Sequence, residues 1–257
     1  MIRRVVVVAA ALAALAFLAL PIVAIFARLS FSHLSGGVVT DAVVVSLKTT
    51  FAAQALVLAF GTPLAYLLAT TRFPGRSLVV TLVELPIVLP PAVAGIGLLA
   101  AFGREGLLHT GLPFTWLAVV VAVAFVSGPL YVRQAIAAFE GVDETLVAAS
   151  RTLGAGPART FFRVSLPLAG GGLGAGEALA FARGLGEFGA TIMFAGSLQG
   201  VTQTLPLAVY QEFDVDFRLA VTLGGLLVLV SAALLLTLKW LVSSSTSPFR
   251  FALSSSR

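Results

Sequence analysis

The 257-residue chain is 59% hydrophobic, holds only 11% charged residues and has a mean hydropathy of +1.06. Because a soluble domain carries about 25% charged residues, this composition excludes a water-soluble globular protein and indicates that lipid is the solvent. The chain has no cysteine, so it forms neither disulfides nor thiolate metal sites.

Six apolar stretches predict an all-α integral membrane protein with about six transmembrane helices in a single transmembrane domain, 1–257. Their residues do not alternate between polar and apolar, which excludes the β-barrel, the other fold that spans membranes. The first stretch is about 23 residues long and no small-x-small cleavage site follows it, so we expect a retained span and not a signal peptide. The stretches lie near 5–27, 47–70, 78–102, 114–138, 168–195 and 218–242.

Basic residues sort by membrane side when the N-terminus is placed in the cytosol. The outer segments then hold only Arg28, Lys48, Arg104 and Arg218. This bias predicts cytosolic termini, and it explains the net charge of +5 without nucleic-acid binding. The inner segments hold Arg3, Arg4, Arg72, Arg76, Arg133, Arg151, Arg159, Arg163, Lys239, Arg250 and Arg257.

The third stretch contains Pro86, Pro90 and Pro91, which together remove three amide donors within six residues. A regular helix cannot continue unkinked through such a run. Freed carbonyls at membrane depth are tolerated where they are buried in protein or face water. The bend therefore either helps helices to pack or forms part of a gate along a transport path.

The longest polar segment, 140–167, lies between the fourth and fifth stretches and is predicted to be cytosolic. Its composition predicts a helix from Glu144 to Leu153, because acidic residues favour a helix start and Gly154 favours its end. Pro157 then suits the first turn of a second helix. One interpretation is a loop lying on the lipid surface; the other is a helix pair that docks into a soluble partner.

The fifth stretch is rich in glycine and carries Glu177, Arg183 and Glu187. Small residues allow close helix packing in lipid, here within the chain or at a dimer interface. Each charge would cost roughly 2.5–3.5 kcal/mol at a helix centre, so these side chains must face protein or water. Arg183 and Glu187 are four residues apart and can pair, either structurally or in the lining of a path. Glu84, near the inner end of the third stretch, is expected to reach toward the interface or to pair with a basic inner loop, and not to contact an anion.

No catalytic or metal-binding pattern is present. There is no phosphate-binding loop of the pattern G-x-x-x-x-G-K-S/T. His33 and His109 stand alone in predicted outer loops, whereas a metal site needs several converging ligands. We therefore expect neither cofactor nor metal, and no catalytic residue.

The polar segment resembles the E-A-A-x3-G-x9-I-x-L-P loop of type I ABC importer permeases. Ala149 and Ser150 are followed by three residues, Gly154, nine residues, and then Val164-Ser165-Leu166-Pro167. The chain departs from the pattern at its glutamate, where Ala148 stands, and Glu144 is the nearest carboxylate. Residues 85–95, 180–191 and 203–210 are similar to the molybdate permease family, with sulfate and tungstate permeases as close relatives. The resemblance extends from about residue 46 to 241.

This resemblance implies a MetI-like fold in the cell (inner) membrane. It implies a second permease copy, a cytosolic ABC ATPase dimer that hydrolyses ATP, and an external oxyanion-binding protein that delivers molybdate. The alternatives are a sulfate, thiosulfate or tungstate permease, an ATP-independent channel or secondary transporter, and a membrane enzyme. The expected ATPase-coupling residues are Glu144, Ala148, Ala149, Arg151, Gly154, Arg159, Leu166 and Pro167. The expected path or gate residues are Pro86, Pro90, Pro91, Arg183, Gly186, Glu187 and Thr191.

Overall fold

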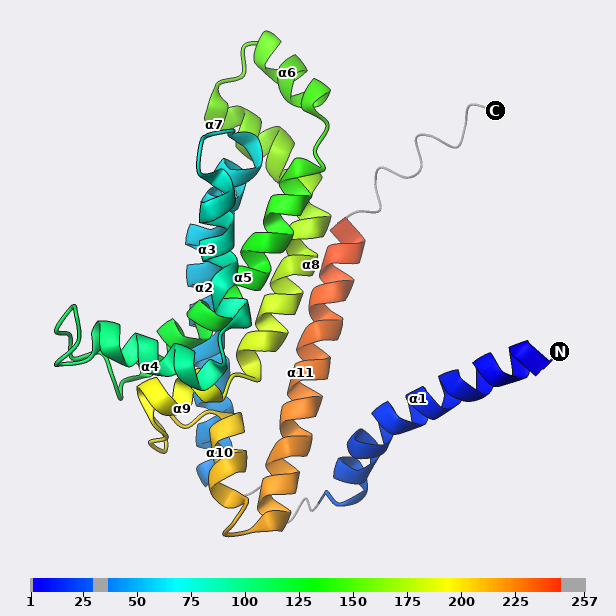
Figure 1. The fold of residues 1–257 in the computed structure, drawn as a ribbon, viewed down its shortest axis with the longest axis vertical. Coiled ribbons are helices and arrows are strands. Elements are labelled where there is room, and N and C mark those ends of the chain that lie inside the picture. Colours follow the sequence, from blue (N-terminus) through cyan, green and yellow to red (C-terminus); the bar gives the residue numbers. More distant parts are fainter. Residues whose placement is uncertain (1, 30–36, 246–257) are drawn as a thin grey trace.

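The computed structural model describes residues 2–29 and 37–245, and its regular elements there are all helices (Figure 1). His33, Arg250 and Arg257 lie outside the described residues. The elements are α1 (Ile2–Ala27), α2 (Gly37–Thr70), α3 (Arg76–Val88), α4 (Pro91–Phe102), α5 (Trp116–Glu140), α6 (Glu144–Thr152), α7 (Pro157–Thr160), the π-helix η2 (Phe161–Ser165), α8 (Leu166–Leu185), α9 (Gly189–Ala195), α10 (Leu205–Glu212) and α11 (Phe217–Ser245).

The centre of the molecule is a bundle in which α5 packs between α2 and α8, with α11 beside α8 (Figure 1). The glycines of α8 make this packing close. A Cβ atom on Gly172 would lie 2.5 Å from the Cβ of Ala138, and one on Gly176 would lie 2.9 Å from the Cβ of Gln134. The close packing predicted for the fifth stretch therefore occurs within the chain, against α5.

The predicted count of six spans is not confirmed. Within residues 2–29 and 37–245, four helices are long and apolar enough to cross a membrane, namely α1, α2, α5 and α11, and the pair α3–α4 is a fifth if it is counted as one span. This pair is bent by 115° between Val88 and Pro91, so the stretch near 78–102 is not one straight helix. The stretch near 168–195 is also divided, because α8 ends at Leu185 and α9 begins only at Gly189.

Helix α1 leaves the bundle at an angle and its apolar surface is exposed in the single chain (Figure 1). It contacts α11 near its C-terminal end, where a Cβ atom on Gly225 would lie 2.5 Å from Leu29 Cδ2. The remaining length of α1 can therefore be covered by lipid or by another chain.

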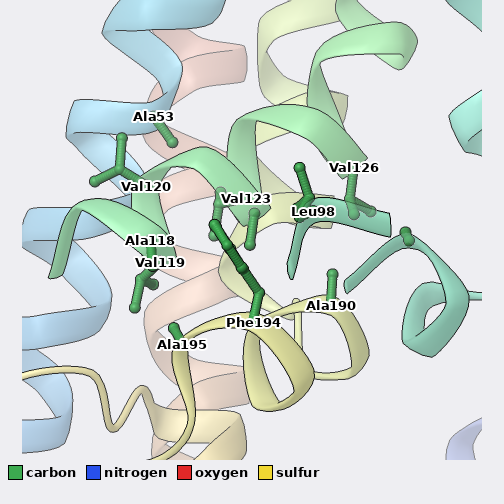
Figure 2. Close-up of a cluster of buried hydrophobic side chains, with 12 residues drawn as sticks. Ala53, Leu98, Ala118, Val119, Val120, Val123, Val126, Ala190, Phe194 and Ala195 are labelled. Atoms are coloured by element: carbon green, nitrogen blue, oxygen red, sulfur yellow. The ribbon is translucent and has the colours of Figure 1, made fainter. Parts of the chain in front are cut away.

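Buried apolar side chains form three clusters along the bundle. The first joins α2, α4, α5 and α9 around Phe194, which is fully buried (Figure 2). The second joins α2, α5 and α8 around Tyr131, and the third joins α2, α10 and α11 around Leu205 and Leu223. The first two clusters hold α9 and α8 against α5. Of the charged residues of the fifth stretch, Glu177 and Arg183 lie within α8 and Glu187 lies between α8 and α9.

Candidate functional site

The polar segment forms a compact unit at one end of the bundle, made of α6, α7 and η2 (Figure 1). The carboxylate of Asp143 accepts a hydrogen bond from the backbone N–H of Thr145 at 2.8 Å and from its hydroxyl at 2.7 Å. These two hydrogen bonds hold the pKa of Asp143 below its ordinary value, and the bond from the Thr145 hydroxyl has the larger effect. This is an N-cap, so α6 starts where the sequence predicts.

Gly154 ends the first helix of this unit as predicted. Its φ of +84° is left-handed, a conformation that residues with a side chain rarely adopt. The N–H of Gly154 donates to the carbonyl of Arg151, and the N–H of Ala155 donates to that of Ser150. The hydroxyls of Ser150 and Thr160 then lie 3.1 Å apart and join α6 to α7.

The unit continues into α8 without a loop, through a π-helical turn that sequence reasoning missed. The N–H of Leu166 donates to the carbonyl of Phe161, five residues earlier. Pro167 follows in the first turn of α8 and supplies no N–H, which gives a physical reason for the altered register just before it. The unit and α8 therefore form one continuous helical segment.

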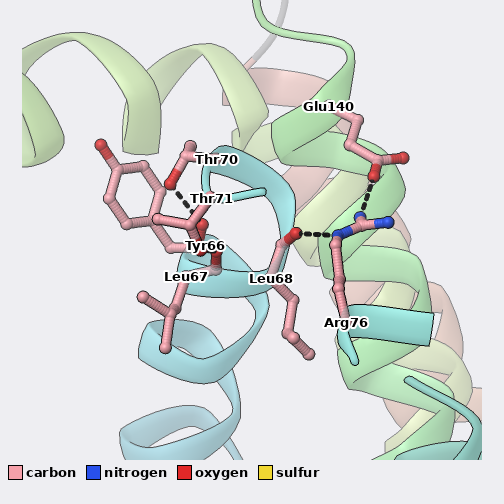
Figure 3. Close-up of polar contacts among 7 residues, drawn as sticks. All are labelled: Tyr66, Leu67, Leu68, Thr70, Thr71, Arg76 and Glu140. Atoms are coloured by element: carbon pink, nitrogen blue, oxygen red, sulfur yellow. Dashed lines mark hydrogen bonds and ion pairs between the residues drawn. The ribbon is translucent and has the colours of Figure 1, made fainter. Parts of the chain in front are cut away.

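Aromatic rings attach the unit to the bundle. Phe161 packs edge-on against Tyr66 of α2 with ring centroids 4.7 Å apart, and Tyr66 packs against Phe139 of α5 at 5.2 Å. Beside this cluster, Arg76 Nη2 lies 2.5 Å from a carboxylate oxygen of Glu140, and its Nε donates to the carbonyl of Leu68 at 2.6 Å (Figure 3). These contacts tie the α2–α3 turn to the end of α5.

A cavity of about 920 Å³ lies between α6 and the ends of α2 and α5. Glu144, Ala148 and Arg151 lie on the face of α6 that lines it. Glu144 and Ala148 therefore share a face, and among the described residues Glu144 is in no ion pair. Ala149 and Arg159 are exposed on the unit, Leu166 is partly buried and Pro167 is exposed.

The unit also exposes large apolar side chains to solvent. Leu153 is 88% exposed at the end of α6, and Leu146 and Phe162 are also exposed. Covering such apolar side chains with a partner removes apolar surface from water, which lowers the free energy and favours binding. We call the surface formed by Leu146 and Leu153 the apical surface.

The break between α3 and α4 lies close to α9. Pro86 remains inside α3, whereas Pro90 is extended and Pro91 is the first residue of α4. A Cβ atom on Gly189 would lie 2.7 Å from the Cβ of Pro91, and one on Gly95 would lie 2.6 Å from the carbonyl oxygen of Ala190. Two glycines therefore allow α4 and α9 to meet backbone to backbone, a contact that sequence reasoning did not find.

Arg183 and Glu187 form the predicted pair, with Arg183 Nη1 2.6 Å from a carboxylate oxygen of Glu187. The Glu187 side chain is 1% exposed and that of Arg183 is 34% exposed. The other oxygen of Glu187 accepts from the N–H of Ala190 at 2.8 Å, so this carboxylate also fixes the start of α9. Gly186 lies in the turn between the helices. The Thr191 hydroxyl is buried and has no hydrogen-bond partner among the described residues.

Two other charged groups of the apolar spans are placed by the structure. Glu84 lies 3.6 Å from Arg133, a basic partner that belongs to helix α5 and not to an inner loop. Glu177 has one carboxylate oxygen that is buried without a partner in the described part of the chain.

The two predicted groups of residues do not converge. The α6–α7 unit lies at one end of the bundle, whereas α4 and α9 lie toward the end that carries α10 (Figure 1). Glu187 precedes α9 and Thr191 lies within it. Helix α8 connects the two groups, because it begins at Leu166 and ends two residues before Glu187. In the described part of the chain, no three His, Cys, Asp or Glu side chains converge as metal ligands would.

The family assignment follows from comparison with known proteins. Residues 61–244 match the family described as binding-protein-dependent transport system inner membrane component. This chain belongs to that family. The matched range contains the α6–α7 unit, α8 and the α3–α4 break, so every predicted site residue of the permease lies within it.

Named relatives and solved structures agree with this assignment. The chain is 43% identical over 239 residues to the molybdenum transport system permease protein ModB of Mycobacterium tuberculosis, covering 88% of this chain and 90% of that protein. It is 46% identical over 178 residues to the protein of the same name in Escherichia coli, covering 66% and 78%.

Two solved transporters share the fold. A chain of the MetNI methionine ABC transporter in an inward-facing conformation matches with a TM-score of 0.66 and 22% identity, covering 80% of this chain and 95% of that one. A chain of a bacterial alginate ABC transporter matches with a TM-score of 0.70 and 15% identity, covering 95% and 98%. The fold is thus that of an ABC importer permease, and the chain is a multi-pass membrane protein.

Proposed function

We propose that this chain is the permease subunit of an ATP-driven molybdate importer in the cell membrane, with both termini in the cytosol. The observation that carries the proposal is 43% identity, over 88% of the chain, to a protein named as a molybdenum transport permease. The complete unit of α6, α7 and η2 adds support, because a permease that hydrolyses no ATP must receive movement from a partner.

The apical surface is the docking site for a cytosolic ATPase dimer, one ATPase subunit for each of two permease copies. Leu153 and Leu146 are exposed there, so an ATPase groove that covers them removes apolar surface from water. Arg159 is also exposed on the unit and adds charge there, and an external oxyanion-binding protein docks at the opposite end.

Movement of the unit reaches the path through α8. Because η2 joins the unit to α8 without a loop, and Phe161 packs on α2 and α5, a shift of α6 also moves the bundle. At the far end, α8 leads into Gly186 and the Glu187–Ala190 bond, and α9 packs on α4 beside Pro91. The α3–α4 break and the α8–α9 turn together form the gate in this proposal.

The path selects weakly among oxyanions, and selection lies mainly in the binding protein. An unpaired arginine in a narrow path would hold a divalent anion tightly and slow its release. Arg183 is neutralised by Glu187 at 2.6 Å, which avoids such a trap.

The test is uptake of labelled molybdate into liposomes that hold this chain, its ATPase and a binding protein, with unlabelled tungstate or sulfate in excess. ATP-dependent uptake that tungstate blocks and sulfate leaves unchanged is the expected result. Uptake of sulfate in place of molybdate would assign the chain to the sulfate and thiosulfate permeases. Flux without ATP would favour a channel or secondary transporter and overturn the proposal.

A further inference from the structure

The cavity between α6 and the bundle is lined by residues that are not part of the proposed transport path. Its wall is made by the ends of α2 and α5, by Arg76 at the start of α3, and by α6. Spans α2 and α5 end at Thr70 and Glu140, so the cavity lies at the depth where a membrane-spanning segment meets water. Lipid headgroups occupy the same depth.

Three arginines line this cavity, and they differ in their partners. Arg76 is already held by Glu140 and by the carbonyl of Leu68. Arg72 and Arg151 are exposed, and within residues 2–29 and 37–245 neither is in an ion pair. Glu144 is the other acidic group of the wall, so two unpaired guanidinium groups face one unpaired carboxylate and leave a positive balance.

We infer that this cavity binds a phosphate-type oxyanion, supplied by the headgroup of an anionic lipid or by free anion in the cytosol. Guanidinium groups bind phosphate oxygens through paired, charge-assisted hydrogen bonds. Basic pockets between membrane helices at the cytosolic side bind anionic headgroups. The remaining wall includes Phe139, Val142 and Val147, which suit the glycerol and acyl part of a lipid. This site does not depend on which anion the protein transports.

The bound anion would link two separate parts of the protein. Arg72 belongs to the turn between α2 and α3, while Arg151 belongs to α6. A phosphate group between them fixes α6 against the bundle, in addition to the aromatic contacts of Phe161. Occupancy of the cavity would therefore stiffen the element on which the ATPase docks.

The experiment measures anion binding by the full-length chain, purified in detergent and freed of lipid. Native mass spectrometry gives the apparent affinity for phosphatidylglycerol and, for comparison, for phosphatidylcholine. The variants are Arg72→Gln, Arg151→Gln and the double variant. Arg159→Gln is the matched control, because Arg159 is exposed on the same unit but does not line the cavity. These side chains are exposed, so we expect all variants to fold.

Each cavity substitution is expected to weaken phosphatidylglycerol binding about fivefold, and the double variant about 25-fold, since one arginine near the surface contributes about 1 kcal/mol. Phosphatidylglycerol binding should be unchanged in Arg159→Gln, and phosphatidylcholine binding should be the same in all variants. If millimolar inorganic phosphate displaces the lipid, free anion shares the site; if it does not, the headgroup is the ligand. Both results support the site.

Two results would overturn the inference. One is phosphatidylglycerol binding that is equal in the wild type and the double variant. The other is unchanged lipid and phosphate binding with loss of ATPase copurification in Arg72→Gln and Arg151→Gln, which would assign the cavity to the ATPase contact.

Discussion

Removal of Arg183 is expected to be more damaging than removal of its partner, Glu187. The two side chains pair at 2.6 Å, but Glu187 is 1% exposed while Arg183 is 34% exposed. In Arg183→Gln a buried carboxylate keeps only the N–H of Ala190 as a partner. In Glu187→Gln the arginine can still reach solvent, and the new amide oxygen can still accept from Ala190.

The magnitudes follow from these exposures. Breaking a buried pair from one side costs about 3–5 kcal/mol. Because Arg183 is a third exposed, we place Arg183→Gln at the lower end, at about 3 kcal/mol, and Glu187→Gln at about 1 kcal/mol. The double variant should also lose only about 1 kcal/mol, since no uncompensated charge remains. In a chain of this size, about 3 kcal/mol corresponds to a fall in melting temperature of roughly 6–12 °C.

The assay is the apparent melting temperature in detergent, followed by size-exclusion fluorescence, with exposed Arg104→Gln as the control. The expected order of stability is wild type, then Glu187→Gln together with the double variant, then Arg183→Gln. Equal losses for the two single variants, or a double variant that loses the sum of both, would refute the argument from burial.

Four further predictions concern other parts of the molecule. Gly95→Ala should destabilise the α4–α9 contact by about 1–3 kcal/mol in the same melting assay, because its Cβ would lie 2.6 Å from a backbone oxygen. Gly97→Ala on the same helix meets nothing within 4 Å and should not destabilise; equal effects would contradict the packing argument. Leu153→Asp should abolish ATPase copurification, whereas Leu107→Asp, 84% exposed in the loop after α4, should retain it. The pKa of Asp143 is lowered from its ordinary value of 3.8 because the carboxylate caps α6, so the cap stabilises α6 fully above that pH. As pH falls below 3.8 and through the lowered pKa, the carboxylate is protonated and the stabilisation should be lost. The protection factors of the amides of residues 144–147, which are corrected for the intrinsic pH dependence of exchange, should then fall in wild type and stay constant in Asp143→Asn; a fall in both would assign the change elsewhere. Glu177→Ala should reduce assembly or ATP coupling while leaving the ratio of molybdate to sulfate uptake unchanged, and a changed ratio in a normally assembled protein would place anion contacts on this residue.

Local features of the sequence predicted much of this structure. The stop at Gly154 and the Arg183–Glu187 pair depend on residues within four positions of each other, so spacing alone indicates them. The acidic residues also indicated where α6 starts, although not the hydrogen bonds that Asp143 accepts there. The bend at Pro90 and Pro91 was also predicted, because the lost amide donors act on their own turn.

Features that depend on distant residues were not predictable in the same way. The contact between Gly95 and Ala190 joins two short helices whose approach is set by the bends before them, and neither bend angle follows from composition. The Arg76–Glu140 pair joins residues 64 positions apart. Hydropathy averages across the breaks at residues 89–90 and 186–188, so it did not show that these two stretches are divided, and its count of six spans is not confirmed.

The most direct test of the central claim compares molybdate uptake with and without ATP in liposomes that hold the complete transporter, for the wild type and for Leu153→Asp. We expect ATP-dependent accumulation in the wild type and none in the variant, although the variant folds normally. Equal uptake with and without ATP, or normal uptake by Leu153→Asp, would contradict the claim that a cytosolic ATPase drives transport through the α6–α7 unit.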